Sequence, residues 1–357
     1  MPEMLLLFKP SPRWWAFITV IVGLCGQGFD AYCWGFAAHR YINESAVYAL
    51  PSPLREFFEY HRLVLKERAV SADQRRAWDP LEAPCHYMDM DRWGDSERLA
   101  LPLHWDSAVQ CYSEKLLRSR GILPWHAPRV YRRLVWAFEQ GNHRLILRTA
   151  ADLGHYLADA HVPLHLCSNY NGQKSGQHGL HALLESRIPE YFGDTMAQTL
   201  RRAEIVKRPA HHLWQIMNDA YAHLERVFDC ECQCRSQVPS HEQYGPFRRG
   251  NRLLRQESIP FVLCYHRCLG GLMGRQLASS VAHVADWWMS AWVEAGQPML
   301  RAQWGSDANN TESFEEEDAE ERWKGGGGED HDPGESSGLR SGVRVGFLRP
   351  ELDRCLW

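Results

Sequence analysis

The segment GHYLADAHVPLH, residues 154–165, constrains the fold and chemistry of this chain more than any other segment. His155 and Asp159 are four residues apart, so they share one face if the segment is helical. A neutral imidazole beside a carboxylate forms a good half-shell for a divalent cation such as zinc. Pro163 is expected to end the helix, which lets His165 turn back toward the same site.

The same pattern recurs a short way along the chain. His181 and Glu185 are again four residues apart, after the loop NYNGQKSGQHG. One such pair on a helix is more often part of a solvated face. Two such pairs, with a histidine between them and a helix that ends at proline, rarely arise by chance. The sequence therefore predicts a cluster of metal ions, and the chain's 18 histidines include many further candidate ligands.

The N-terminus has the pattern of a secretory signal. Basic residues precede an apolar run at 14–24, which is too short to span a bilayer comfortably, and small residues follow up to Cys33. We expect cleavage before Trp34 and export to the periplasm, the cell surface or the extracellular space. An uncleaved anchor or a mis-assigned start codon is the alternative.

Export changes how the 11 cysteines are interpreted, because disulfides form outside the cytosol. A C-x-C-x-C cluster is formed by Cys230, Cys232 and Cys234, and Cys264 and Cys268 lie nearby in the sequence. A zinc knuckle and disulfides between the two groups both fit this spacing. We expect disulfides, with a connectivity that the sequence does not give, and at least one of the nine cysteines after the signal left over.

The body of the chain shows helical periodicity and no convincing strand alternation. Apolar residues recur at helical spacing between Arg144 and Ala160, and Gly141 provides a stop after the preceding segment. Similar segments are expected at 104–119, 130–140, 178–190, 195–227 and 278–296. The sequence therefore predicts an all-α fold, with metal ligands facing inward from several helices.

The last part of the chain differs in composition from the body. Residues 305–357 carry 14 acidic and 6 basic side chains, with a GGGG run and a stretch rich in Ser, Gly and Asp. Such a segment buries too little apolar surface to fold. We therefore expect a signal peptide at 1–33, a single multi-helical domain at 34–304 and a disordered tail at 305–357.

Three further motifs precede the histidine cluster. They are WGFAAH at 34–39, ADQRR at 72–76 and HYMD at 86–89. Each motif alone is more often structural than functional. In this order, and with the two His-x-x-x-carboxylate pairs, they resemble the superfamily of bacterial zinc-dependent phospholipase C and the zinc-dependent single-strand nucleases of fungi and plants. The resemblance covers residues 34–189.

The resemblance implies a trinuclear zinc cleft in an all-helical fold with nine protein ligands. The free amine and carbonyl of the N-terminal tryptophan are ligands in the family, and the other eight are side chains. The implied ligands here are Trp34, His39, Asp73, His86, His155, Asp159, His165, His181 and Glu185. Asp159 is implied to bridge two zinc ions, Arg76 to meet phosphate charge, and Asp89 to support the site from behind the ligands. Asp73, Arg76 and Asp159 are thus the residues expected to act in catalysis.

The implied activity is secreted, zinc-dependent hydrolysis of phosphodiesters, with zinc lowering the pKa of an attacking water to about 7. Glu185 is typical of the phospholipases, because the nucleases usually carry Asp at this position. The spacing from Trp34 to His39 and the aromatic residue after His86 are typical of the nucleases. We expect a phospholipase C-like enzyme, with a single-strand nuclease as the alternative and a non-catalytic, zinc-stabilised binding module as a second alternative.

The expected partners follow from these hypotheses. The substrate is either a phospholipid headgroup or single-stranded nucleic acid, since abundant tryptophan and a mildly basic body suit both. A transient contact with a membrane surface accompanies the first hypothesis. No stable protein partner is expected.

Overall fold

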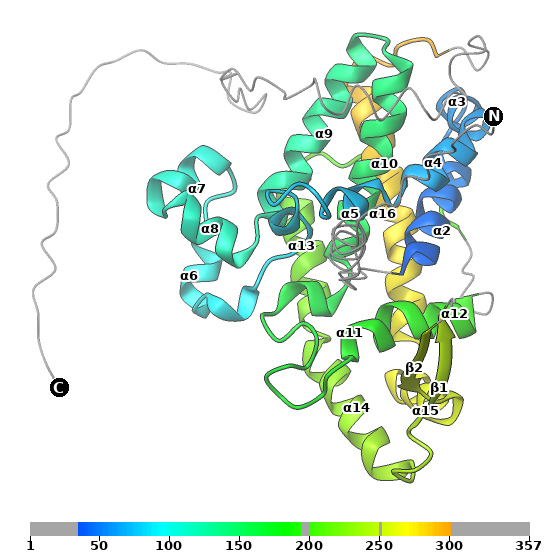
Figure 1. Cartoon of the computed structure of the whole chain (residues 1–357). Coiled ribbons are helices and arrows are strands. Elements are labelled where there is room, and N and C mark those ends of the chain that lie inside the picture. The colour runs from blue at the N-terminus through cyan, green and yellow to red at the C-terminus, as the bar shows by residue number, and fades with distance from the viewer. Residues whose placement is uncertain (1–34, 194–199, 250–251, 301–357) are drawn as a thin grey trace, which may run out of the picture. The chain divides into compact units, whose positions relative to one another are not determined.

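The computed structural model describes residues 35–193, 200–249 and 252–300, and most of these residues are helical. Figure 1 shows a body of packed helices with one small β-hairpin. The all-α prediction is therefore confirmed. The expected signal peptide, the ligand Trp34 and the expected disordered tail at 305–357 lie outside the described residues.

The elements follow one another along the chain with short connections. The helices are α2 (Phe36–Ala46), α3 (Leu54–Tyr60), α4 (Arg62–Arg68), α5 (Ser71–Arg75), α6 (Asp95–Leu99), α7 (Trp105–Cys111), α8 (Glu114–Arg120), α9 (Leu123–Glu139), α10 (His143–Ala160), α11 (Leu180–Ala182), α12 (Ile188–Phe192), α13 (Pro209–Tyr221), α14 (Leu224–Gln237), α15 (Ile259–Leu269) and α16 (Leu272–Glu294). Short 3-10 turns are η1 (Val47–Ala49), η2 (Ala83–His86), η3 (Met90–Arg92) and η4 (Pro163–Leu166), and η5 (Leu183–Arg187) is a π-helical turn. The strands are β1 (Tyr244–Arg249) and β2 (Arg252–Glu257).

Helix α10 lies at the centre of the helical body. It packs against α2, α4, α9, α13 and α16, and Figure 1 shows α9, α10 and α16 side by side. The side chain of Asn142 accepts a hydrogen bond from the Leu145 amide at 3.0 Å, which fixes the start of the helix. Most of its residues are buried, so α10 is a core helix. The polar side chains that it carries are therefore held away from bulk water.

A close approach between α2 and α10 places the first candidate ligands together. A Cβ atom at Gly154 would lie 2.0 Å from Oδ1 of Asn43, so this position accommodates only glycine without a shift. The Asn43 amide donates to the carbonyl of Ala151 at 3.1 Å and ties the two helices together. As a result, the rings of His39 and His155 stack with their centroids 3.9 Å apart.

Two features of the predicted secondary structure were wrong. Strands β1 and β2 form an antiparallel hairpin where no strand was expected. Its facing pairs mix apolar and basic side chains, as in Arg248 with Leu253, so the sequence does not alternate as a half-buried strand does. The Gly250-Asn251 dipeptide was a usable turn signal.

The helix expected over 195–227 instead begins at Pro209, because proline favours the first helical turn and disfavours helical geometry in the residue before it.

The expected disulfides between the two cysteine groups are confirmed. Cys230 pairs with Cys268 and Cys234 pairs with Cys264, which joins α14 to α15 at two points. Cys232 is exposed and forms no disulfide with any described cysteine. The two helices flank the hairpin in the sequence, so the disulfides fix both of its ends.

Acid should destabilise the fold through His61, which is 2 % exposed. Burial first, and the nearby His143 second, lower its pKa from 6.5 to about 4. The unfolded chain therefore binds more protons between these values, and stability falls as the pH drops from about 6.5 to about 4. We expect a loss of about 1–2 kcal/mol after allowance for solvent screening.

The check compares thermal unfolding of the wild type, His61→Gln and the exposed control His241→Gln at several pH values. The His61→Gln protein should lose less stability on acidification than the other two. Identical pH dependence in all three proteins would show that His61 does not carry this effect.

Candidate metal centre

Eight predicted ligands from distant parts of the chain meet in the structure. They fall into three groups, and within each group the ligand atoms lie within 4.8 Å of one another. The groups are His39, His155 and Asp159; Asp73, His86 and His155; and His165, His181 and Glu185. Each group can bind a metal ion. We refer to the eight residues together as the metal centre.

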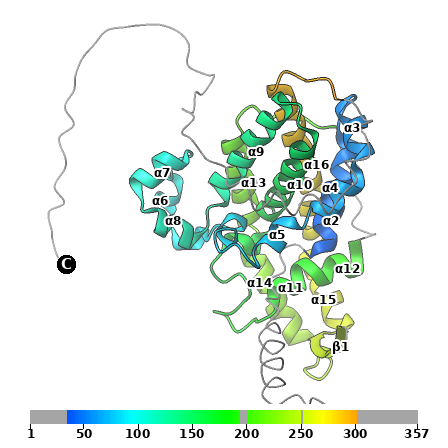
Figure 2. The ribbon, with the colours of Figure 1, turned by 45° about the horizontal axis from the view of Figure 1, so that its top comes forward.

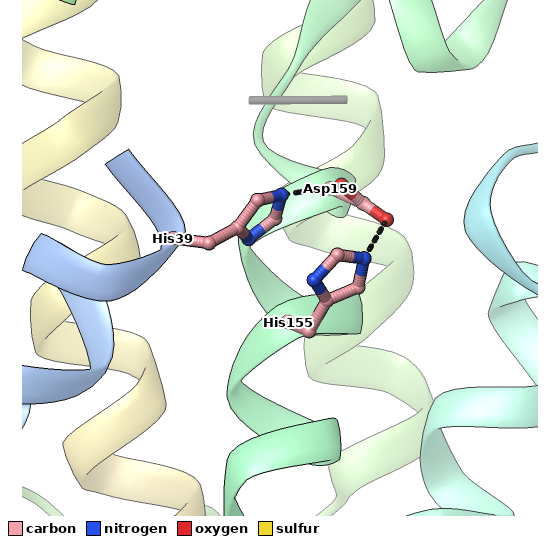
Figure 3. Close-up of side chains that lie close together, drawn as sticks. All are labelled: His39, His155 and Asp159. Carbon is pink, nitrogen blue, oxygen red and sulfur yellow. Dashed lines mark ion pairs between the residues drawn. The ribbon is translucent and has the colours of Figure 1, made fainter. Parts of the chain in front are cut away.

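Asp159 is the common neighbour of these groups. Its Oδ1 lies 3.4 Å from Nε2 of His39, and its Oδ2 lies 3.3 Å from Nε2 of His155, one turn earlier on α10. Figure 3 shows these three side chains converging from α2 and α10. The same carboxylate lies 2.9 Å from Nδ1 of His86 and 3.8 Å from Nδ1 of His165. Asp159 is fully buried, so it has no bulk water to solvate its charge.

The third group is built by two local turns. As predicted, α10 ends before Pro163, and η4 then turns His165 back toward the centre, where its Nδ1 contacts the carbonyl of His86 at 2.7 Å. On the following elements α11 and η5, His181 and Glu185 lie on one face, with Nε2 3.2 Å from Oε2. Nε2 of His165 lies 3.4 Å from the other oxygen of Glu185.

In three histidines, one ring nitrogen contacts a backbone carbonyl and the other ring nitrogen faces carboxylates. Nδ1 of His155 contacts the carbonyl of Ala69 at 2.8 Å, and Nδ1 of His181 contacts that of Tyr170 at 3.2 Å. His165 does the same through its contact with His86. A donor Nδ1–H leaves Nε2 with a free lone pair, which is the usual arrangement of a metal-binding histidine. The backbone thus orients Nε2 of each ring toward its group.

Several buried polar atoms of the metal centre make no hydrogen bond within the described part of the chain. They are both ring nitrogens of His39, Oδ2 of Asp73, Oδ1 of Asp159, Nε2 of His165 and both carboxylate oxygens of Glu185. Unpaired buried polar atoms are rare and costly, and here they converge on the same three groups. Divalent cations bound to these atoms would satisfy them. The residues therefore fit a multinuclear metal centre, and imidazole with carboxylate is a donor set that suits zinc.

Opposite charges balance within the metal centre. Burial favours the neutral acid at Asp159, but the neighbouring His155 and His165 outweigh it and hold the pKa of Asp159 well below its usual range. Burial also opposes protonation of His155, yet Asp159 and Asp73 raise its pKa to about 9. Asp159 and Glu185 raise the pKa of His165 to about 9 against the same penalty. Metal ions can replace these protons, so metal binding should release protons.

The metal centre opens onto a cleft of about 900 Å³. His86, His165, His181 and Glu185 form part of its wall, together with Arg76. Residues of α12 and of the hairpin form another part of the wall. Figure 2 shows α11, α12, α15 and β1 gathered at one end of the helical body. A ligand of moderate size can therefore reach the third group of the metal centre from solvent.

Arg76 and Asp89 lie in the cleft wall, as residues that meet a substrate would. Nη1 of Arg76 is 3.4 Å from Oδ1 of Asp73, and the rest of its side chain is partly exposed. The carboxylate of Asp89 lies 3.5 Å from Nη1 of Arg92. Burial, followed by the charge of Asp91, raises the pKa of Asp89 to about 6.

The residues that support the ligands from behind were missed by the sequence analysis. Oε1 of Glu82 lies 3.2 Å from Nε2 of His86 and accepts a hydrogen bond from the Tyr156 hydroxyl at 2.5 Å. Arg75 joins the network, with Nε 3.2 Å from Glu82 and Nη1 3.1 Å from Asp152. Asp152 and Tyr156 are four residues apart on α10, which was the only local signal for this network.

We expect Glu82→Gln to weaken metal binding by about 10- to 100-fold, because the carboxylate that orients His86 is lost. Calorimetric titration of zinc into the metal-free protein measures this affinity. Glu59→Gln, a change at an exposed carboxylate on α3, serves as the control. Wild-type affinity in Glu82→Gln would show that the network does not position His86.

Comparison with known proteins adds no family to these observations: no family model matches the chain, and no curated protein matches it. Among the described residues, no helix is both long enough and apolar enough to cross a membrane. The site itself must therefore carry the functional argument.

Proposed function

We propose that this protein is a secreted, zinc-dependent phosphodiester hydrolase that holds three zinc ions and resembles phospholipase C. The observation that carries the proposal is the convergence of eight imidazoles and carboxylates, six of them buried, on three adjacent groups, next to a cleft with an arginine in its wall. Zinc ions bound there would act as Lewis acids and supply a water-derived nucleophile near neutral pH.

The residues of the chain have distinct tasks under this proposal. Arg76 binds the non-bridging phosphate oxygens, because its planar guanidinium can donate two parallel hydrogen bonds. Asp159 holds the groups of the metal centre together through its two oxygens. Asp89 can hold a proton in the cleft near pH 6. The buried surroundings of the groups strengthen each of these interactions.

The finer choice of substrate favours a phospholipid. Glu185 is the carboxylate that the phospholipase branch carries, and it is fully buried in the third group. The alternative is a single-strand nuclease, supported by Tyr87 after His86 and by Tyr170 and Phe247, which line the cleft and offer rings for base stacking.

The test is an assay of zinc-loaded protein beginning at Trp34 on two substrates in parallel, a phosphocholine ester and single-stranded DNA. Faster hydrolysis of the phosphocholine ester supports the phospholipase proposal, and faster cleavage of DNA supports the nuclease. Bound zinc with no activity on either substrate would favour the second alternative, a zinc-stabilised binding module. A protein that binds no zinc would overturn all three.

A further inference from the structure

The hairpin of β1 and β2 carries a combination of residues that the proposed active site does not use. The hairpin, residues 244–257, includes four arginines and one acidic residue, Glu257. Two leucines are also exposed on β2, Leu253 at 74 % and Leu254 at 40 %. Charged side chains alone would be explained as protection of an exposed strand edge. Adjacent exposed leucines do not protect an edge, so the hairpin needs another explanation.

The two faces of the hairpin differ. Phe247 faces Leu254 across the strands, and both residues line the cleft. The next pair, Arg248 with Leu253, has the opposite orientation because side chains alternate along a strand. Arg248 and Leu253 are both exposed and are not part of the cleft wall. Residues 254–257 line the cleft, whereas Arg248 and Leu253, nearer the tip of the hairpin, present a basic and apolar pair to solvent.

The hairpin is held firmly at its base. The Ser258 amide donates to the carbonyl of Gln243 at 2.9 Å, closing the end of the strands. The two disulfides join α14 to α15 on either side of it. The Arg187 guanidinium lies 4.7 Å from the ring centroid of Phe247, which fixes the cleft-facing side against the π-helical turn that carries Glu185. The exposed pair therefore has a defined position beside the cleft.

We propose that the outward face of the hairpin, formed by Arg248 and Leu253, docks this protein on an anionic phospholipid surface beside the cleft. Arg248 on this face matches the negative charge of a lipid headgroup layer. Exposed leucine can enter the boundary between headgroups and acyl chains, where it leaves water. This proposal rests on the proposed function, and it specifies that the phospholipid substrate is part of a lipid assembly rather than a free molecule.

Single-stranded nucleic acid fits the same face less well. Binding of that ligand combines phosphate-binding cations with aromatic rings on which bases stack. Among the described side chains of this face, the exposed ones near Arg248 and Leu253 are not aromatic, and the ring of Tyr244 is covered by Arg255, whose guanidinium lies 4.1 Å from the ring centroid. A leucine 74 % exposed gives a nucleic acid nothing to stack on. The chemistry of this face therefore favours lipid.

Binding of the zinc-loaded protein to vesicles tests the proposal independently of catalysis. We would measure sedimentation with vesicles of phosphatidylcholine alone and of an equal mixture of phosphatidylcholine and phosphatidylserine. The wild type should bind the mixed vesicles more tightly, and added salt should weaken this binding. The double variant Arg248→Glu/Leu253→Glu should bind the mixed vesicles at least about tenfold more weakly than the wild type does.

The control Leu99→Glu/Arg202→Glu changes charge equally at an exposed leucine on α6 and an exposed arginine elsewhere. It should bind as the wild type does. Both variants should hydrolyse a soluble short-chain phosphodiester at the wild-type rate, because none of the four residues lines the cleft.

Equal vesicle binding by the wild type and the hairpin variant would overturn the docking proposal. A second result would also overturn it: neither protein binds vesicles, and a single-stranded oligonucleotide binds the wild type but not the hairpin variant. Hairpin-dependent vesicle binding without hydrolysis of any phosphodiester would support docking and overturn the proposed function. Hydrolysis of the soluble substrate without vesicle binding would support the proposed function and overturn the docking proposal.

Discussion

Replacing Asp159 with asparagine is expected to reduce phosphodiester hydrolysis by several orders of magnitude and to lower the zinc content of the protein. The carboxylate lies within 3.4 Å of imidazole nitrogens on His39, His86 and His155. Asparagine keeps the size of the side chain but removes the charge, so the loss would affect more than one group of the metal centre at once. Zinc content by elemental analysis and the hydrolysis rate measure the two effects.

A matched control for this change lies on the same helix. Asp152, two turns before Asp159 on α10, pairs with Arg75 and is not a ligand. Asp152→Asn acts on the centre only through the network behind His86, so it should weaken zinc binding slightly, leave the zinc content at saturation unchanged and reduce the rate far less. Near-normal zinc content and turnover in Asp159→Asn would contradict its central place in the metal centre.

Replacing Arg76 with alanine should lower kcat/KM by about 100- to 1000-fold, because a charge-assisted donor to the phosphate is lost. Arg76→Lys keeps the charge but loses the planar pair of donors, so it should recover only part of the activity. Zinc stoichiometry should not change in either protein. Steady-state kinetics and elemental analysis together separate a phosphate contact from a role in metal binding.

The neighbouring Arg75 differs from Arg76 in its surroundings. It is directed toward Glu82, Asp152 and Tyr156, away from the cleft. Arg75→Lys should weaken metal binding and stability, since the network behind His86 is disturbed. If Arg76→Ala lost zinc as Arg75→Lys does, Arg76 would be a structural residue and the phosphate assignment would fail.

Local sequence patterns correctly predicted the parts of the site that lie within one element. The four-residue spacing of His155 and Asp159 places both on one face of α10 whatever the rest of the chain does. Pro163 ends the helix for a local reason, since proline lacks the amide donor. His181 and Glu185 also keep their spacing on one face, although the π-helical turn at Leu183–Arg187 was not foreseen.

Contacts between distant segments could not be read from spacing. The sequence placed Asp73 and His86 in the site only through the resemblance to zinc hydrolases, and their approach to α10 depends on packing of the segments that carry them. Glu82 and Arg75 had no recognisable motif, because a carboxylate that supports a ligand is defined by what it touches. The hairpin was missed because its strands do not alternate.

The sequence by itself determined that this chain is helical, that it carries paired imidazoles and carboxylates at helical spacing, and that two cysteine groups are within reach of each other. These properties depend on residues a few positions apart, for which the backbone geometry is known in advance. Only the tertiary structure decided that eight of the predicted ligands meet in three adjacent groups, and that the hairpin lines their cleft. Both depend on close packing of residues far apart in the chain, as where Gly154 lets α2 approach α10, and no local pattern encodes the partner of such a contact.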